Sequence, residues 1–139
     1  IFYAHDARSN VVRTRVSGAA GAADFLAYCE RVLADPAVGP GFLEVLSVDP
    51  SADFHLASGE LLPFRRLWRC YLELWRCYLE KGLAGTLVHA PSDHGYGVFR
   101  MFEAMIGSEA LDPAVRFEVH REAAAVERRL AELRERARA

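Results

Sequence analysis

The 139-residue chain lacks the features that mark membrane proteins and nucleic-acid-binding proteins. No stretch approaches the roughly 18 consecutive apolar residues of a membrane-spanning helix, and no basic segment followed by an apolar one opens the sequence. Its 17 lysine and arginine residues do not outnumber its 19 aspartates and glutamates. Because nucleic-acid-binding domains usually carry clustered excess basic residues, we expect no nucleic-acid partner, no stable membrane insertion and a cytoplasmic location.

The sequence patterns of metal sites and disulfide frameworks are also missing. The three cysteines, Cys29, Cys70 and Cys77, contain no C-x-x-C pair, and the five histidines never form H-x-x-H or H-x-x-x-H. An odd number of scattered cysteines is atypical of a disulfide framework, so a reducing compartment fits the sequence best. We therefore expect no metal site and no cofactor. Cys70 and Cys77 are seven residues apart on one helical face, and we expect them to be small buried hydrophobic residues.

The sequence does contain enough apolar residues, 52% of the total, for one compact domain covering 1–139. Its apolar periodicity predicts the order strand, strand, helix, strand, helix, strand, helix, strand, helix, which is typical of an α/β fold. In the last helix Glu132 and Arg136 are four residues apart, and we expect them to form an ion pair. The predicted strands are 1–6, 11–17, 42–48, 83–90 and 115–120, the predicted helices lie between 21 and 35 and at 58–80, 98–106 and 121–139, and 91–97 is a predicted loop.

Two segments of the chain resemble a known family. They read DFLAYCERVLADP at 24–36 and APSDHGYGVFRMFEA at 90–104. With these segments, the chain resembles bacterial SpoIIAA-like proteins of the STAS superfamily over nearly its whole length. The resemblance implies a STAS-like mixed sheet of four or five strands packed with about four helices. It also implies a small regulatory or ligand-sensing module.

Anti-sigma-factor antagonists of this superfamily carry an aspartate after a central strand and a phosphorylatable serine at the start of the next helix. Asp49 and Ser58 are the nearest matches in this sequence. A phosphate is favoured at a helix N-terminus, where free N–H groups and the positive end of the helix dipole stabilise its charge. The resemblance therefore implies that Ser58 is a possible phospho-acceptor. The alternative is that Ser58 is a plain N-cap of the long helix.

The predicted loop 91–97 connects the carboxyl end of a strand to a helix, which is where open α/β sheets commonly bind ligands. Ser92, Asp93, His94 and Tyr96 therefore form a possible ligand or partner loop. Asp93 and His94 could act as an acid–base pair, but no nucleophile has a recognisable catalytic spacing to them. The alternative is an ordinary helix cap and turn. We predict no catalytic residue, and keep an enzyme that uses Asp93 and His94 as a minority hypothesis.

An identical seven-residue sequence, LWRCYLE, occurs twice in succession over 67–80, inside the long second helix. Seven residues at about 100° each make about 700°, so both copies present the same helix face. Trp68, Tyr71, Trp75 and Tyr78 form an aromatic stripe at this spacing, and we predict an interaction helix. In this interpretation one copy packs on the sheet and the other forms a homodimer contact. The competing interpretation is a monomer whose second copy is looped out or folded back over its own domain.

These observations lead to two functional hypotheses. The first is a non-enzymatic, cytoplasmic regulatory or protein-interaction module that resembles anti-sigma-factor antagonist domains and binds a regulatory protein or a second copy of itself. The alternative is a small carrier or sensor of an apolar, lipid-like ligand in a pocket between the helices and the sheet. A pocket of about 300 Å³ or more between the long helix and the sheet favours the carrier, whereas a filled core favours the interaction module.

Overall fold

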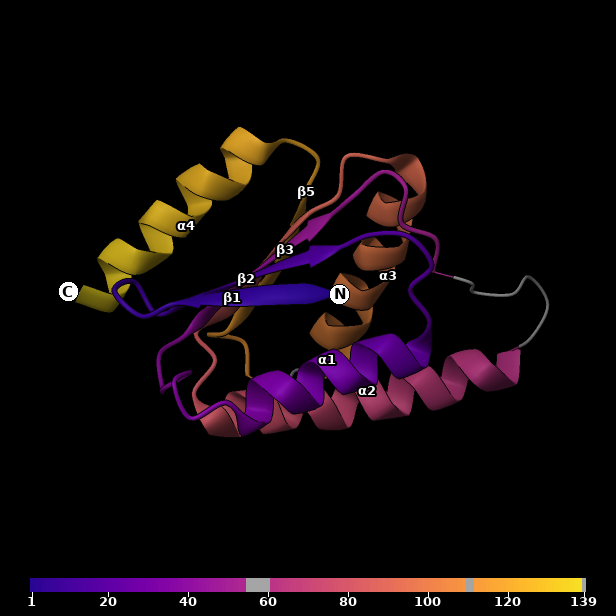
Figure 1. Ribbon diagram of the computed structural model, residues 1–139, viewed down its shortest axis with the longest axis horizontal. Coiled ribbons are helices and arrows are strands. Elements are labelled where there is room, and N and C mark those ends of the chain that lie inside the picture. The colour runs from indigo at the N-terminus through magenta and orange to yellow at the C-terminus, as the bar shows by residue number, and fades with distance from the viewer. Residues whose placement is uncertain (55–60, 110–111, 139) are drawn as a thin grey trace.

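The computed structural model of the chain describes residues 1–54, 61–109 and 112–138, and for residues 22, 61–68, 70, 71 and 138 it describes only the backbone. Within these residues five strands and four helices occur in the order that the sequence predicted (Figure 1). None of these helices is both long enough and apolar enough to cross a membrane. The strands are β1 (Phe2–Asp6), β2 (Val11–Val16), β3 (Leu43–Val48), β4 (Gly85–His89) and β5 (Arg116–His120), and the helices are α1 (Ala22–Ala34), α2 (Leu61–Lys81), α3 (Asp93–Glu109) and α4 (Ala123–Arg138).

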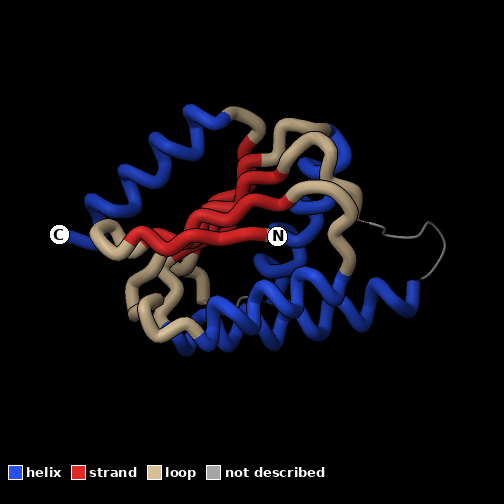
Figure 2. The backbone as a smooth tube through the Cα atoms, viewed as in Figure 1, coloured by secondary structure: helices blue, strands red, loops and turns tan. Residues whose placement is uncertain are grey.

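The five strands form one mixed sheet in the order β1-β2-β3-β4-β5 (Figure 2). β1 and β2 are an antiparallel hairpin, and every later neighbour is parallel. Parallel neighbours need a crossover connection, and α1, α2 and α3 supply the three crossovers. The predicted α/β class, with a mixed sheet of five strands and four helices, is therefore confirmed.

Side-chain alternation along the strands separates two apolar layers. In β3, Leu46 belongs to the larger core under α1, α2 and α3, whereas Val45 packs in a smaller core with Val126 and Leu130 of α4. This period of two is the expected consequence of a pleated strand that is buried on both faces. Helices α1 and α2 lie side by side on one side of the sheet, and α4 lies on the other side (Figure 1).

Helix α2 is continuous through both copies of the repeated heptad, so the second copy is not looped out. The monomer of the competing interpretation stays a prediction. Its 21 residues span about 31 Å, whereas the 13 residues of α1 span about 20 Å. The N-terminal end of α2 accordingly extends past the end of α1 (Figure 1). The second copy packs against the sheet, because Trp75 and Tyr78 are each only 3% exposed. One copy on the sheet is what the sequence predicted.

Three sequence-based expectations need correction. Helix α3 begins at Asp93, so most of the predicted loop 91–97 is its first turn and a half, and Ser92 stabilises this start as its cap. Cys77 is exposed rather than buried. It lies on the outer face of α2, whereas Trp75 and Tyr78 lie on the inward face. Glu132 binds Arg129, not Arg136.

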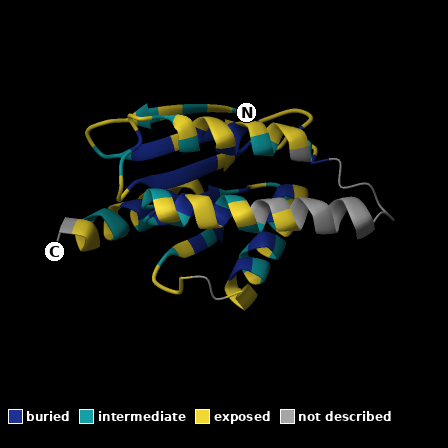
Figure 3. Cartoon of the chain, turned by 90° about the horizontal axis from the view of Figure 1, so that it is seen from below, coloured by how far each residue is buried: buried dark blue, intermediate teal, exposed yellow. Residues whose placement is uncertain are grey.

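The exposed outer faces of α1 and α2 are turned toward the viewer in Figure 3.

Candidate functional site

Glu44 places a carboxyl group inside the larger apolar core. It is the second residue of β3, and alternation along the strand gives it the same face as Leu46 and Val48, toward α1 and α2. The residue is only 3% exposed. Burial of a carboxyl group is costly unless hydrogen bonds replace its water, so the groups around Glu44 form a candidate site.

Two hydroxyl groups donate hydrogen bonds to this carboxyl group, and a third hydroxyl bonds one of the two donors. Tyr28 of α1 donates a hydrogen bond to Glu44 Oε2 at 2.6 Å, and Thr86 of β4 donates to Oε1 at 2.9 Å. Thr86 is opposite Glu44 in the register of the two parallel strands. Thr14 of β2 lies 2.6 Å from the Tyr28 hydroxyl and completes the chain of hydrogen bonds. These residues tie α1 to three neighbouring strands.

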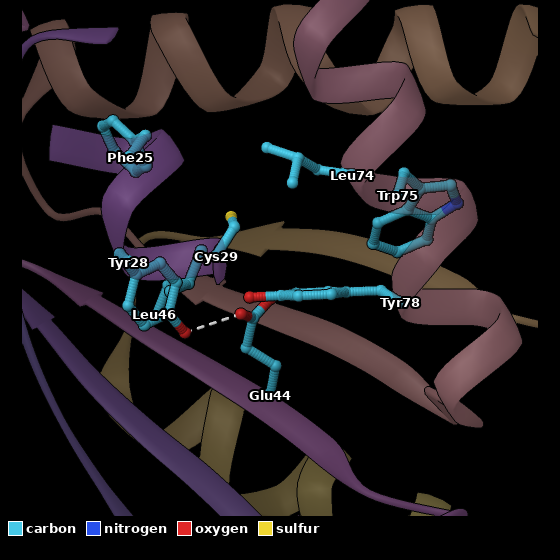
Figure 4. A pocket seen from close by; sticks show the side chains of 8 residues that line it. All are labelled: Phe25, Tyr28, Cys29, Glu44, Leu46, Leu74, Trp75 and Tyr78. Carbon is cyan, nitrogen blue, oxygen red and sulfur yellow. Dashed lines mark hydrogen bonds between the residues drawn. The ribbon is translucent and has the colours of Figure 1, made fainter. Parts of the chain in front are cut away.

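A small cavity lies beside this carboxyl group, between α1, α2 and the sheet (Figure 4). Its volume is about 20 Å³, which is enough for one water molecule. The buried hydroxyl of Tyr78 makes no hydrogen bond within the described part of the chain, and in Figure 4 it points toward Glu44. The lining residues are Phe25, Tyr28 and Cys29 of α1, Glu44 and Leu46 of β3, and Leu74, Trp75 and Tyr78 of α2. We call Thr14, Tyr28, Cys29, Glu44, Tyr78 and Thr86 the Glu44 cluster.

Burial sets the protonation of the Glu44 cluster. It raises the pKa of the Glu44 carboxyl, while the hydrogen bonds from Tyr28 and Thr86 act in the opposite direction. Burial, with the nearby Glu44 charge, raises the pKa of the Cys29 thiol to about 12 and the pKa of Tyr28 well above its ordinary value. The pKa of Tyr78 is also raised by burial. At neutral pH the thiol and both phenols therefore stay protonated, which makes them poor nucleophiles and poor metal ligands.

No cluster of three or more metal-ligating side chains occurs among the residues that the structure describes. The Glu44 cluster offers one carboxyl group and one protonated thiol, and it contains no cationic partner that would hold an anionic cofactor. Its hydrogen bonds connect elements of the fold, and its cavity is too small for an organic ligand. The arrangement fixes α1 and α2 on the sheet and holds at most a water molecule.

Asp49 directly follows β3, the middle strand of the sheet, and the sequence predicted this position after a central strand. Its Oδ1 accepts a hydrogen bond from the Ser51 backbone N–H at 2.9 Å, and its Oδ2 lies 2.7 Å from the Arg15 guanidinium. The backbone N–H of Ser51 is the largest of the causes that lower the pKa of Asp49 to about 2. Asp49 thus closes the turn after the strand. Ser58 lies outside the described residues, so the implied pairing of Asp49 with Ser58 stays a prediction.

The residues of the predicted ligand loop make separate contacts, and Arg121 joins two of them, Asp93 and Tyr96. The Ser92 hydroxyl oxygen accepts a hydrogen bond from the Gly95 backbone N–H at 3.0 Å and caps α3. Arg121 forms a 2.7 Å ion pair with Asp93, and its guanidinium lies 4.2 Å from the centre of the Tyr96 ring. His94 is exposed beside the ring of Phe54, at 5.7 Å between ring centres.

No hydrogen bond joins Asp93 to His94 in the part of the chain that the structure describes. Asp93 points to Arg121 and is almost fully exposed, with 93% of its side chain accessible, so it does not orient or activate the imidazole. The geometry gives no support to the minority hypothesis of an acid–base pair. A ligand or partner contact at this helix start stays a prediction.

Within the predicted interaction helix, the structure describes the aromatic side chains of the second heptad copy but not those of the first. Trp75 and Tyr78 point into the core, and each packs edge-on against an aromatic ring, Phe117 and Phe42 respectively. For Trp68 and Tyr71 the structure describes only the backbone of α2. Glu44 is not among the site residues that the sequence predicts. The available signal was a charged residue inside the apolar run 42–48, which we interpreted only as a strand.

Comparison of the chain with family models, with curated proteins and with solved structures gave no match. The resemblance to SpoIIAA-like proteins therefore stays a prediction.

Proposed function

We propose that the protein is a non-enzymatic regulatory or protein-interaction module of the SpoIIAA-like, STAS type, which associates through α2. The observation that carries the proposal is the filled core between α2 and the sheet. Beside Glu44, the described side chains of α1, α2 and β3 leave a cavity of only about 20 Å³. Small-molecule pockets usually measure about 300 Å³ or more, so the cavity beside Glu44 has no room for a lipid-like ligand. A filled core favours the interaction module over the carrier.

The two heptad copies suggest where the interaction lies. The second copy fills the core through Trp75 and Tyr78. The first copy has the same sequence and, at about 20° of phase difference, the same helix face. It lies directly behind the N-terminal turns of α2 that extend past the end of α1 (Figure 1). An exposed aromatic stripe is unfavourable in water, and we propose that a second protein surface covers Trp68 and Tyr71.

We propose a second copy of the chain as this partner. The exposed side chains of α2 include Arg69, Glu73, Arg76 and Glu80, with equal numbers of positive and negative charges. At about 100° per residue these four charges lie on the outer face of α2, roughly opposite the aromatic stripe, so a contact made by the stripe leaves them in water. A twofold dimer is also the commonest closed assembly of identical chains.

The oligomeric state of a one-heptad variant tests the proposal. Deletion of 67–73 or of 74–80 yields the same protein, because the copies are identical. The variant keeps one LWRCYLE to fill the core, and α2 shortens from 21 to 14 residues, or about 21 Å. We expect light scattering to show a dimer for the full chain and a monomer for the variant, with matching circular dichroism spectra. A monomeric full chain, or an equally dimeric variant, contradicts the proposal.

The resemblance to anti-sigma-factor antagonists adds a second part to this proposal, the phosphorylation of Ser58, which is tested independently of the dimer. A phosphate on Ser58 would change the charge ahead of α2 and thereby change the binding of a regulatory protein. Mass spectrometry of the protein isolated from its native cells tests this element. Phosphorylation of Ser58 supports it, and an unmodified Ser58 together with a phosphate on another residue contradicts it.

A further inference from the structure

A groove of about 370 Å³ lies at the end of the sheet where the parallel strands begin, away from the Glu44 cluster. Its apolar lining comes from Leu43 at the start of β3, Ala84 just before β4, Leu133 of α4 and the segment 113–114. Arg116 and Arg136 complete the lining. The volume lies within the range of about 300 to 1,000 Å³ that is usual for small-molecule pockets.

The guanidinium groups of both groove arginines lack a partner among the residues that the structure describes. Arg116 begins β5 and Arg136 lies in the last turns of α4, and both are exposed. Neither forms an ion pair or a hydrogen bond with any residue that the structure describes. The partner that the sequence predicted for Arg136 is engaged elsewhere, because Glu132 accepts a 2.8 Å hydrogen bond from Arg129. Two cationic groups therefore line a groove that also has an apolar wall of Leu43, Ala84 and Leu133.

We propose that this groove binds an organic carboxylate with an apolar body. Arginine presents planar, parallel N–H donors that match the two oxygens of a carboxylate. The carboxylate would lie against Arg116 and Arg136, and the apolar body would cover Leu43, Ala84 and Leu133. Such a ligand satisfies both kinds of surface in the groove, which neither a purely apolar molecule nor a small inorganic anion does.

The position of the groove favours a carboxylate over a phosphate ester. Arg136 lies near the C-terminal end of α4, where the helix dipole is negative. No helix N-terminus contributes to the lining, so the backbone donors that commonly hold phosphate groups are missing from it. A singly charged carboxylate is repelled less by the helix end than a doubly charged phosphate. The groove contains no residue of α2, so it is independent of the proposed dimer contact.

Titration with octanoate tests the proposal, with octan-1-ol as the neutral probe of equal chain length and inorganic phosphate as the anion without an apolar body. The readouts are amide chemical shifts in a ¹⁵N-labelled sample and calorimetry. The variants are Arg116→Gln and Arg136→Gln. The matched control is Arg128→Gln, which removes another exposed arginine of α4 that lies outside the groove.

We expect saturable octanoate binding with shifts around Leu43, Ala84 and Leu133. Loss of one charged hydrogen-bonding partner should raise the Kd about tenfold in each groove variant, and Arg128→Gln should leave it unchanged. Octan-1-ol and phosphate should each bind more weakly than octanoate. Absence of saturable binding, equal binding of octan-1-ol or phosphate, or an equal loss in Arg128→Gln overturns the proposal.

Discussion

The hydroxyl of Tyr28 in α1 donates a 2.6 Å hydrogen bond to the buried carboxyl group of Glu44 in β3. This bond connects the first crossover helix to the middle strand of the sheet, and Thr86 extends the connection to β4. Because burial makes an unpaired carboxyl oxygen costly, the position of α1 on the sheet depends on the Tyr28 hydroxyl.

Removal of this hydroxyl should destabilise the domain. Tyr28→Phe keeps the ring but leaves one oxygen of Glu44 without its donor, so the free energy of unfolding should fall by about 1 to 3 kcal/mol. Tyr3→Phe is the matched control, because the Tyr3 hydroxyl bonds the more accessible Asp35 at 2.9 Å, and water can replace it there. Urea unfolding measures both. An equal loss in the two variants would show that the Glu44 cluster has no special role.

The stability of the protein should depend on pH through Glu44. The folded state raises the pKa of this carboxyl, because burial disfavours its charged form. A raised pKa stabilises the fold below the ordinary value of glutamate, and this contribution is lost as the pH rises through the folded-state pKa. The unfolding free energy of the wild type, minus that of Glu44→Gln, should therefore increase as the pH is lowered from 8 to 5. A difference that is constant, or that decreases on acidification, contradicts this assignment.

The same substitution in the two heptad copies should have different effects. Trp75→Ala removes a side chain that is 3% exposed in the core, and should lower the unfolding free energy of the monomer by about 3 to 5 kcal/mol. Trp68→Ala has identical neighbours within its heptad, but we expect it to weaken dimerisation with little effect on the monomer. Chemical unfolding at low protein concentration and light scattering at high concentration separate the two effects. Equal destabilisation by both substitutions would place Trp68 in the monomer core.

The cap of α3 should contribute measurably to stability. Ser92→Ala removes the oxygen that accepts the Gly95 backbone N–H, and we expect a loss of about 1 kcal/mol. Ser108→Ala near the other end of α3 is the control, because the exposed Ser108 hydroxyl only donates to the Met105 carbonyl of its own helix. Thermal unfolding compares the two. A stability of Ser92→Ala equal to that of the control would exclude a capping role.

The order of the elements could be predicted because each one carries its own periodicity. The strand 42–48 and the helix containing Tyr28 and Val32 show apolar patterns that are independent of the rest of the chain. The start of α3 was predicted five residues late, since Pro91, Gly95 and Gly97 are typical of a loop. Capping by Ser92 and the contacts of Arg121 with Asp93 and Tyr96 offset the weak helix propensity of this segment.

The Glu44 cluster could not be predicted, because it forms only when the tertiary structure is complete. Tyr28 and Glu44 are 16 residues apart, and Glu44 and Thr86 are 42 apart, so no local spacing reveals their contact. Their meeting depends on the register of β3 with β4. The exposure of Cys77 could have been predicted, since at about 100° per residue it is turned about 200° from Trp75.

The central claim is that the first heptad copy forms a contact between two chains. Hydrogen exchange of α2 tests this claim most directly, because it reports both the association and its location. Exchange is measured by mass spectrometry at low and at high protein concentration, with α1 as the internal reference. We predict that amides of 61–73 exchange more slowly at high concentration, while those of 22–34 do not change. The one-heptad variant should show no concentration dependence in what remains of α2. Equal exchange of 61–73 at both concentrations, under conditions in which the protein stays folded, would contradict the claim.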